Sequence, residues 1–211
     1  WRDLARKLAH EIKNPLTPMS LSIFALQKRV DHLPEADRAI ARRSLAAMLE
    51  EITQLTRLAD NFSQYARLPE PRDEALDLSE VARAASALHE PQAITLRVQC
   101  NAAQPVRGDR LLLTRALHNL LVNAFEASPA GSTVELVSGR DGSEAWVEVR
   151  DRGTGIDAAI AAKVFEPYVS TKNRGSGLGL SLVHDIAGQH HGGVTLTNRE
   201  GGGAIARLTL P

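Results

Sequence analysis

The sequence predicts an α+β protein in which an antiparallel helical hairpin is followed by an α/β sandwich. Apolar residues recur at spacings of three and four throughout residues 2–66, which predicts long helices. Prolines and charged residues interrupt this pattern over residues 68–75, which we interpret as a linker. Beyond the linker, strand patterns and helical patterns mix without strict alternation, which predicts a mixed sheet with helices on one face. We therefore assign residues 1–67 to the hairpin and residues 76–211 to the sandwich.

Composition and charge narrow the classes of function. The 25 Lys and Arg residues balance the 25 Asp and Glu residues, so no global basic field favours nucleic acid as a partner. Cys100 is the only cysteine, which excludes an internal disulfide. No apolar run approaches the roughly 20 residues of a membrane span, and no signal peptide is visible. The chain starts at Trp1 within a helical pattern, so we expect a fragment that reaches a membrane only through a part not present in this chain.

Residues 2–30 form the first predicted helix. Its apolar residues occupy two positions of a heptad, one held by Ile12, Met19 and Leu26 and the other by Ala9, Leu16, Ile23 and Val30. Pro15 and Pro18 lack the backbone N–H that would reach the carbonyl four residues earlier, so we expect a kink just after His10.

A turn over residues 31–37 leads into a second predicted helix that ends near Ala66. Its apolar stripe comprises Ile40, Leu45, Met48, Leu49, Ile52, Leu55, Leu58 and Phe62. Two helices alone cannot bury both stripes, so we expect a homodimer in which two hairpins form a four-helix bundle.

The sandwich is predicted to contain three helices and five strands. The helices are expected at residues 78–88, 110–128 and 178–191, with Ser79 as the N-cap of the first and Asp109 directly before the second. The strands are expected at residues 94–100, 134–137, 145–150, 194–197 and 204–210, the last four as two hairpins.

The first helix carries a candidate catalytic cluster of His10, Glu11 and Asn14. His10 and Asn14 are four residues apart and share a helical face outside the heptad core. One interpretation is a nucleophilic imidazole beside an acid that fixes its tautomer or takes its proton. The other is an exposed histidine on a helical hairpin, which is the commoner origin of a lone His-Glu pair.

Asn119 and Asn123 are four residues apart on an otherwise apolar helix, so the two amides share one face. An amide carbonyl is a hard oxygen ligand that suits a Mg²⁺ ion holding phosphate oxygens. In isolation, such a pair is more typical of solvated surface amides.

Two glycine motifs follow. The first, Asp151-Arg-Gly153-Thr-Gly155, comes directly after a strand, where its carboxylate could accept a hydrogen bond from a purine amino group. An ordinary strand-exit turn is the alternative. The second motif contains Gly175, Gly177 and Gly179 and leads straight into a helix, where backbone amides could bind phosphate. A plain flexible loop is the alternative there.

Residues 164–174 lie between these motifs and are predicted to form a mobile lid. Phe165 and Tyr168 are its expected apolar anchors. Lys172 and Arg174 could meet phosphate charge, or could be a solvated basic stretch.

The order of the motifs is more specific than any one of them. His-Glu-x-x-Asn-Pro, Asn-x-x-x-Asn, Asp-x-Gly-x-Gly, Phe-Glu-Pro-Tyr and Gly-x-Gly-Leu-Gly follow one another as in the sensor histidine kinases of two-component signalling, which this chain resembles over nearly its whole length. The first helix is most similar to the nitrogen-regulatory NtrY/NtrB-type branch. The resemblance implies an α/β sandwich of the GHKL type, ATP and Mg²⁺ as cofactors, and the cytoplasmic portion of a bacterial sensor anchored in the inner membrane.

The resemblance also implies a role for each candidate residue. His10 matches the phosphoacceptor, Glu11 its general base, and Asn14 the residue that orients water when such kinases dephosphorylate their regulator. In the sandwich, Asn123 matches the Mg²⁺ ligand, Asn119 its upstream partner, Asp151 the adenine-binding aspartate, and Gly153, Gly155, Gly175, Gly177 and Gly179 the glycines that flank the nucleotide lid.

Two positions depart from the family pattern. Glu126 stands where many members carry a basic residue one turn after the Mg²⁺ ligand, so Lys172 or Arg174 is expected to supply that charge. Tyr168 replaces the usual Phe. The implied partners are a second copy of the chain and the receiver domain of a response regulator of the NtrX or NtrC type.

Two other functions fit parts of the sequence. The first is an ATPase of the same GHKL superfamily, but those enzymes activate water with a glutamate at the position of Asn119, and an amide cannot act as that base. The second is a phosphatase-biased scaffold without kinase activity. The intact Asn123 and Asp151 argue against loss of ATP binding, but they leave the balance of the two activities open.

Overall fold

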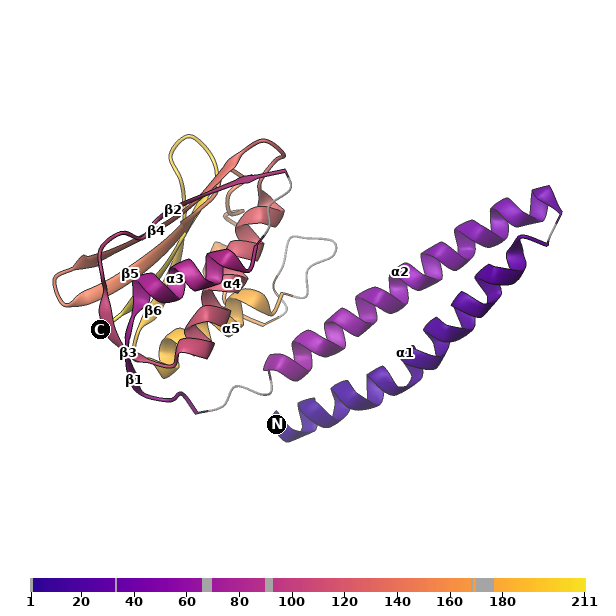
Figure 1. The fold of residues 1–211 in the computed structure, drawn as a ribbon, viewed down its shortest axis with the longest axis horizontal. Coiled ribbons are helices and arrows are strands. Elements are labelled where there is room, and N and C mark those ends of the chain that lie inside the picture. The colour runs from indigo at the N-terminus through magenta and orange to yellow at the C-terminus, as the bar shows by residue number, and fades with distance from the viewer. Residues whose placement is uncertain (1, 33, 66–69, 90–92, 168, 170–176) are drawn as a thin grey trace. The chain divides into compact units, whose positions relative to one another are not determined.

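This computed structural model describes residues 2–32, 34–65, 70–89, 93–167, 169 and 177–211, without the side chains of residues 2–10, 36, 57–58 and 60–65. The chain divides into two compact units. One is a pair of helices, and the other contains every strand of the described residues (Figure 1). The predicted α+β class, with the hairpin before the sandwich, is confirmed.

The helical unit consists of α1 (Arg2–Val30), which has the predicted bounds, and α2 (Glu35–Tyr65). α2 ends one residue before the predicted Ala66 but starts at Glu35, within the stretch predicted as a turn. Helix α1 continues through Pro15 and Pro18 without a break in its helical backbone. Hydroxyl groups of Ser20 and Ser22 donate to the carbonyls four residues earlier, at 3.0 and 2.9 Å. Such side-chain bonds to the preceding helical turn often accompany a bent helix.

Only one of the two heptad positions of α1 is buried between the helices. Leu16, Ile23 and Val30 are between 5% and 7% exposed, and they cluster with Leu45 and Ile52 of α2. The other position, held by Ile12, Met19 and Leu26, is between 42% and 52% exposed. The hairpin therefore covers half of its apolar surface and leaves the other half open.

The second unit is built on a five-stranded sheet with strand order β2-β4-β5-β7-β6. These strands are β2 (Thr95–Gln99), β4 (Thr133–Asp141), β5 (Glu144–Arg150), β6 (Gly193–Asn198) and β7 (Ala204–Leu210). β2 runs parallel to β4, and every other neighbouring pair is antiparallel. The mixed sheet and both predicted hairpins are thus confirmed.

Helices α3 (Leu78–Ala87), α4 (Arg110–Ala127) and α5 (Gly179–Gln189) lie on one face of this sheet (Figure 1). Their apolar faces and the inward side of the sheet form one core. Its members, none more than 1% exposed, include Leu78, Val81, Leu113, Leu117, Leu121, Val134, Leu136, Val147, Val183, Ile186 and Leu208. This core fixes the positions at which α4, α5 and the end of β5 meet.

Two details of the sequence prediction are corrected. Asp77, and not Ser79, caps α3, because its carboxylate accepts from the backbone N–H of Ser79 at 2.9 Å. The hydroxyl of Ser79 is buried instead, 2.7 Å from the carbonyl oxygen of Ala102. The segment predicted as a linker, residues 68–75, also contains the start of a strand.

That strand is β1 (Glu74–Asp77), which pairs with β3 (Pro105–Gly108) in a separate two-stranded sheet. Four-residue strands are too short to show a recognisable alternation, so neither was predicted. The remaining element is a 3₁₀ turn, η1 (Ala161–Lys163), which precedes the predicted lid.

Candidate functional site

Asn119 and Asn123 lie on the same half-buried face of α4, as predicted from their spacing. The side-chain N–H of Asn119 donates to the carbonyl oxygen of Arg115 at 2.9 Å, which fixes the direction of its amide. A Cβ atom placed on Gly179 would lie 3.4 Å from Oδ1 of Asn119, 3.7 Å from Nδ2 of Asn123 and 4.0 Å from Oδ1 of Asn123. The structure therefore brings both amide groups against the first residue of α5.

Helix α5 starts at this point. Its N-cap residue is Leu178, whose side chain has no polar atom to cap the helix. The first turn of a helix carries N–H groups without intrahelical partners, and a partial positive charge accompanies them. Gly177 adopts a positive φ of 65°, which glycine accepts readily and which turns the chain into the helix. Gly175 lies outside the described residues, so its predicted place here is untested.

Asp151 sits at the end of β5 and is only 7% exposed. Its Oδ1 accepts from the backbone N–H of Gly153 at 2.8 Å and from that of Ala204 at 3.1 Å. These two bonds tie one carboxylate oxygen to the turn and to β7. The carboxylate is thereby held rigidly at the strand end, where the second oxygen can accept from a ligand.

At both glycine positions of this turn, the surrounding atoms leave no room for a side chain. A Cβ on Gly153 would lie 2.4 Å from the carbonyl oxygen of Ala127, so only glycine lets the turn pack against the end of α4. Gly155 has a φ of 75°, and a Cβ there would meet Oδ1 of Asn198 at 2.6 Å. The close approach of Gly153 to Ala127 joins the Asp151 turn to the helix that carries Asn119 and Asn123.

Asn198, at the end of β6, belongs to this site and was not predicted. Its Oδ1 accepts from the backbone N–H of Ile156 at 2.6 Å, and its Nδ2 donates to the carbonyl of the same residue at 3.1 Å. The paired bonds fix the chain just after Gly155. An isolated asparagine at the end of a strand gives no sequence signal for such a role.

The predicted lid is described only in part. Val164 is buried, and the ring of Phe165 lies 5.8 Å from that of His184 on α5, in agreement with an anchoring role for Phe165. Tyr168, Lys172 and Arg174 lie outside the described residues. The expected contact of a basic side chain with phosphate therefore remains a prediction.

The predicted catalytic cluster lies on α1 in the helical unit. Glu11 and Asn14 are exposed, on the half of the helix that precedes the buried Leu16. His10 belongs to the same helix, and its side chain lies outside the described part of the structure. These residues and the Asn119 site belong to different units.

An α/β sandwich with this sheet order, with paired amides facing a glycine-rich helix start, defines a domain of the histidine kinase and gyrase type of ATPase. Residues 108–211 match the family model described as "Histidine kinase-, DNA gyrase B-, and HSP90-like ATPase". Residues 1–71 match the model described as "His Kinase A (phospho-acceptor) domain". The chain belongs to the sensor histidine kinases, as the order of its motifs predicted.

Individual relatives agree with this assignment. The whole chain aligns at 36% identity with the nitrogen regulation protein NtrY of Azorhizobium caulinodans and covers 28% of that protein. Over 99% of its length it aligns at 33% identity with the C4-dicarboxylate transport sensor protein DctS of Rhodobacter capsulatus, and it covers 33% of that protein. Among solved structures, full-length ShkA in complex with AMPPNP superposes with a TM-score of 0.70 at 25% identity, over 99% of this chain and 45% of that one.

The chain spans about a third or less of the two named relatives. Within the part of the chain that the structure describes, no helix combines the length and the apolar character that a membrane span needs.

Proposed function

We propose that this chain phosphorylates itself on His10 with ATP and passes the phosphoryl group to an aspartate of a response regulator. One observation carries the proposal: a phosphoacceptor-type hairpin and an ATPase-type sandwich occur in one chain, and the sandwich places two amides against the glycine at the start of α5. ATP is the proposed phosphoryl donor, and the similarity to a kinase solved with AMPPNP supports it.

In the nucleotide site, Asp151 is proposed to accept a hydrogen bond from the adenine amino group. Two backbone N–H groups donate to its buried Oδ1, which supports this role because the carboxylate is already oriented before a ligand binds. The N–H groups at the start of α5, with Gly177 and Gly179, are proposed to bind the phosphates. Gly153 and Gly155 keep the adenine side of the site closely packed, and Lys172 and Gly175 are proposed to complete the phosphate side.

Asn123 is proposed to hold Mg²⁺, with Asn119 beside it. The donor set fits, since both amide groups lie beside the helix start where phosphate would bind, the oxygen of Asn119 faces it, and amide oxygens are ligands that Mg²⁺ accepts. When bound, the ion neutralises charge on the transferred phosphate. The protein itself contributes the position of both amides, which the capped and buried α4 fixes.

The chemical step is an in-line displacement. A ring nitrogen of His10 attacks the γ-phosphorus of ATP, the bond from that phosphorus to the bridging oxygen breaks, and ADP leaves. Glu11 takes the imidazole proton, and its exposed position next to His10 on α1 supports that role. Since His10 and the nucleotide site lie in different units, the step requires the two units to approach, and residues 68–74 are the proposed hinge.

Asn14 is proposed to orient water in the reverse activity, the dephosphorylation of the regulator. It is exposed and one helical turn after His10, so it can reach a phosphoryl group held on a docked partner. The partner is proposed to be a receiver domain of the NtrX or NtrC type, in line with the similarity to NtrY.

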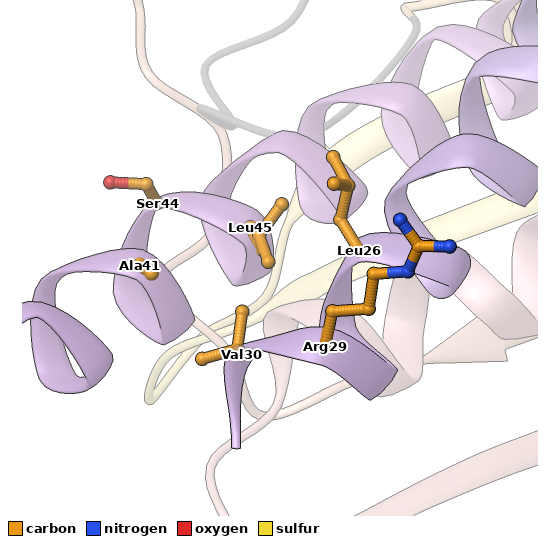
Figure 2. Close-up of a pocket in the computed structure, with 6 residues that line it drawn as sticks. All are labelled: Leu26, Arg29, Val30, Ala41, Ser44 and Leu45. Carbon is orange, nitrogen blue, oxygen red and sulfur yellow. The ribbon is translucent and has the colours of Figure 1, made fainter. Parts of the chain in front are cut away.

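The working form is proposed to be a homodimer. A hollow of about 340 Å³ lies on the helical unit, between the end of α1 and the start of α2. Figure 2 shows the residues that line it, of which Leu26, Val30, Ala41 and Leu45 are apolar. The hollow continues the exposed heptad position of Met19 and Leu26, which a second hairpin would cover in a four-helix bundle.

This chain is proposed to be the cytoplasmic portion of a longer protein that is anchored in the inner membrane. A chain that spans only 28–33% of the two named relatives is consistent with that proposal.

The direct test is to incubate the purified chain with Mg²⁺ and γ-labelled ATP beside the His10→Gln variant. A label that is labile to acid, stable to alkali and absent from the variant is expected, since phosphohistidine has these stabilities. Nucleotide binding without label would instead favour a phosphatase-biased scaffold. Steady phosphate release from both proteins would favour the ATPase.

A further inference from the structure

A second polar cluster lies at the opposite ends of α4 and α5 from the paired amides. It consists of Asp109 and His190, and we call it the latch. His190 follows the last residue of α5 and is 6% exposed, and Asp109 caps α4 and is 7% exposed. Nothing in the proposed chemistry uses either residue.

The ring of His190 bonds to both helices. Nδ1 lies 2.7 Å from the carbonyl oxygen of Ile186, and Nε2 lies 2.9 Å from the backbone nitrogen of Asp109. Because the N–H of Asp109 is a donor, Nε2 must accept, and Nδ1 carries the proton toward Ile186. The neutral tautomer is therefore fixed, and it connects the end of α5 to the start of α4.

The carboxylate of Asp109 extends the connection. Its Oδ1 accepts from the N–H groups of Leu111 and Leu112 at 2.9 and 3.0 Å. Its Oδ2 accepts from the backbone N–H of Arg72 at 2.9 Å, within the predicted linker. One buried pair thus joins α4, α5 and the chain that enters the sandwich.

The two helices α4 and α5 connect the latch to the proposed nucleotide site. α5 is 11 residues long, and Asn119 is the tenth residue after Asp109, so both stretches measure about 15 Å. The helices are bonded at one end and meet at Gly179 and the two amides at the other. Apolar packing between them is not directional, whereas the hydrogen bonds of the latch are.

The backbone is shaped for the ring. A Cβ on Gly108 would lie 2.6 Å from Cδ2 of His190, so a side chain at residue 108 would displace the imidazole. The structure thereby offers a way to disturb the latch without changing either of its members.

We propose that His190 is a positioning residue for nucleotide binding, which sets the register of α5 against α4 and so holds Gly179 against Asn119 and Asn123. This inference rests on the proposed function for the identity of the ligand. A packing role alone would affect the stability of the sandwich and leave the affinity of the folded protein unchanged.

The test uses the full chain and four variants. His190→Leu removes the acceptor, His190→Gln supplies an oxygen acceptor of similar reach, and Gly108→Ala pushes the ring from the other side. Ile186→Val removes one buried methyl group from α5 but keeps the backbone carbonyl to which His190 bonds, so it serves as a control that lowers stability while the hydrogen bonds of the latch are kept. The dissociation constant for a non-hydrolysable ATP analogue with Mg²⁺ is measured by calorimetry, well below the unfolding temperature of every variant.

His190→Leu and Gly108→Ala are expected to weaken binding about tenfold, since each leaves the N–H of Asp109 buried without its acceptor. His190→Gln is expected to recover most of the affinity, and Ile186→Val to bind like the wild type. Unchanged affinity in folded His190→Leu, or an equal loss in Ile186→Val, would overturn the inference.

The outcome is separable from that of the labelling experiment. Binding by the wild type without phosphohistidine would refute the kinase and leave the latch to be judged on affinity. A wild-type chain that binds no nucleotide would overturn both.

Discussion

The helical unit leaves half of its apolar stripe open to solvent, whereas the sandwich closes its core within a single chain. Ile12, Met19 and Leu26 on α1 are exposed, as are Ile40, Met48 and Leu55 on α2. In the sandwich, five of the six leucines of α4 are at most 2% exposed, and Leu111 alone is open to solvent. The sandwich therefore holds its site ready by itself, while the helical unit is completed only by a partner.

The polar residues differ in the same way. Asp151, Asn198 and Asn119 are each fixed by hydrogen bonds from their surroundings. Glu11 and Asn14 stand exposed on one helix. The proposed nucleotide site is therefore preorganised, whereas the proposed site around His10 must be assembled by what docks on it.

Asn123→Ala is expected to lower the rate of autophosphorylation at least about 100-fold, because it removes the proposed ligand for Mg²⁺. The dimer should remain intact, since the change lies in the sandwich. Labelling with γ-labelled ATP and analytical ultracentrifugation measure the two effects. Asn101→Ala, an exposed amide in a loop, is the matched control. A rate within threefold of the wild type would show that Asn123 is not in the site.

Met19→Glu is expected to raise the dissociation constant of the dimer at least about 100-fold, because two carboxylates would be buried across a two-fold interface. Affinity for nucleotide should not change. Sedimentation equilibrium gives the first quantity and calorimetry the second. Ala25→Glu places the same charge on an exposed position of the same helix and should leave the dimer intact. Equal association of both variants would break the contrast between the units.

Asp109→Asn tests the electrostatic part of the sandwich. Burial opposes the charge of Asp109, but the backbone N–H groups of Arg72, Leu112 and Leu111 outweigh it, and the pKa of the carboxyl lies below its usual value. A lowered pKa contributes stability that is present above the unfolded pKa of about 3.9 and is lost as the pH falls through the folded pKa.

The variant is therefore expected to lose about 1 kcal/mol of unfolding free energy at pH 7, and the gap to the wild type should close below pH 4. Urea unfolding between pH 3 and pH 7 measures it. A gap that stays constant with pH would mean that the charge of Asp109 adds nothing.

His191→Gly is expected to stabilise the sandwich by about 1 kcal/mol. His191 is the only non-glycine residue with a positive φ among the described residues, at 56°, and glycine adopts this conformation without strain. The gain is reduced by the extra freedom of glycine in the unfolded chain. Urea unfolding again provides the measurement, and His191→Ala is the control that should give no gain.

Several parts of the molecule could be predicted because their signals are local. The spacing of apolar residues over residues 2–66 predicted both long helices, and Asp109 indicated the start of α4. The spacing of Asn119 and Asn123 put them on one face, and the glycines after Asp151 indicated a close approach that Ala127 and Asn198 now explain.

Other parts depend on contacts between distant residues. Asn198 and Asp151 are brought to one place by the order of the strands, which no local pattern encodes. The same holds for His190, which meets Asp109 across 81 residues of sequence. Ser79 is predicted as the cap of α3 because serine favours caps, but its buried hydroxyl bonds to the carbonyl oxygen of Ala102 and the hydroxyl of Ser138 on β4 instead.

Scanning calorimetry of the full chain tests the contrast between the units most directly. Scans would be made over a 100-fold range of protein concentration, with and without Mg²⁺ and a non-hydrolysable ATP analogue. We expect two transitions. One should rise in temperature with protein concentration alone, as a helical dimer requires. The other should rise in temperature with nucleotide alone, because a ligand at 100 times its dissociation constant adds about 2.7 kcal/mol to the free energy of unfolding. A single transition that responds to both, or a helical transition independent of concentration, would contradict the account.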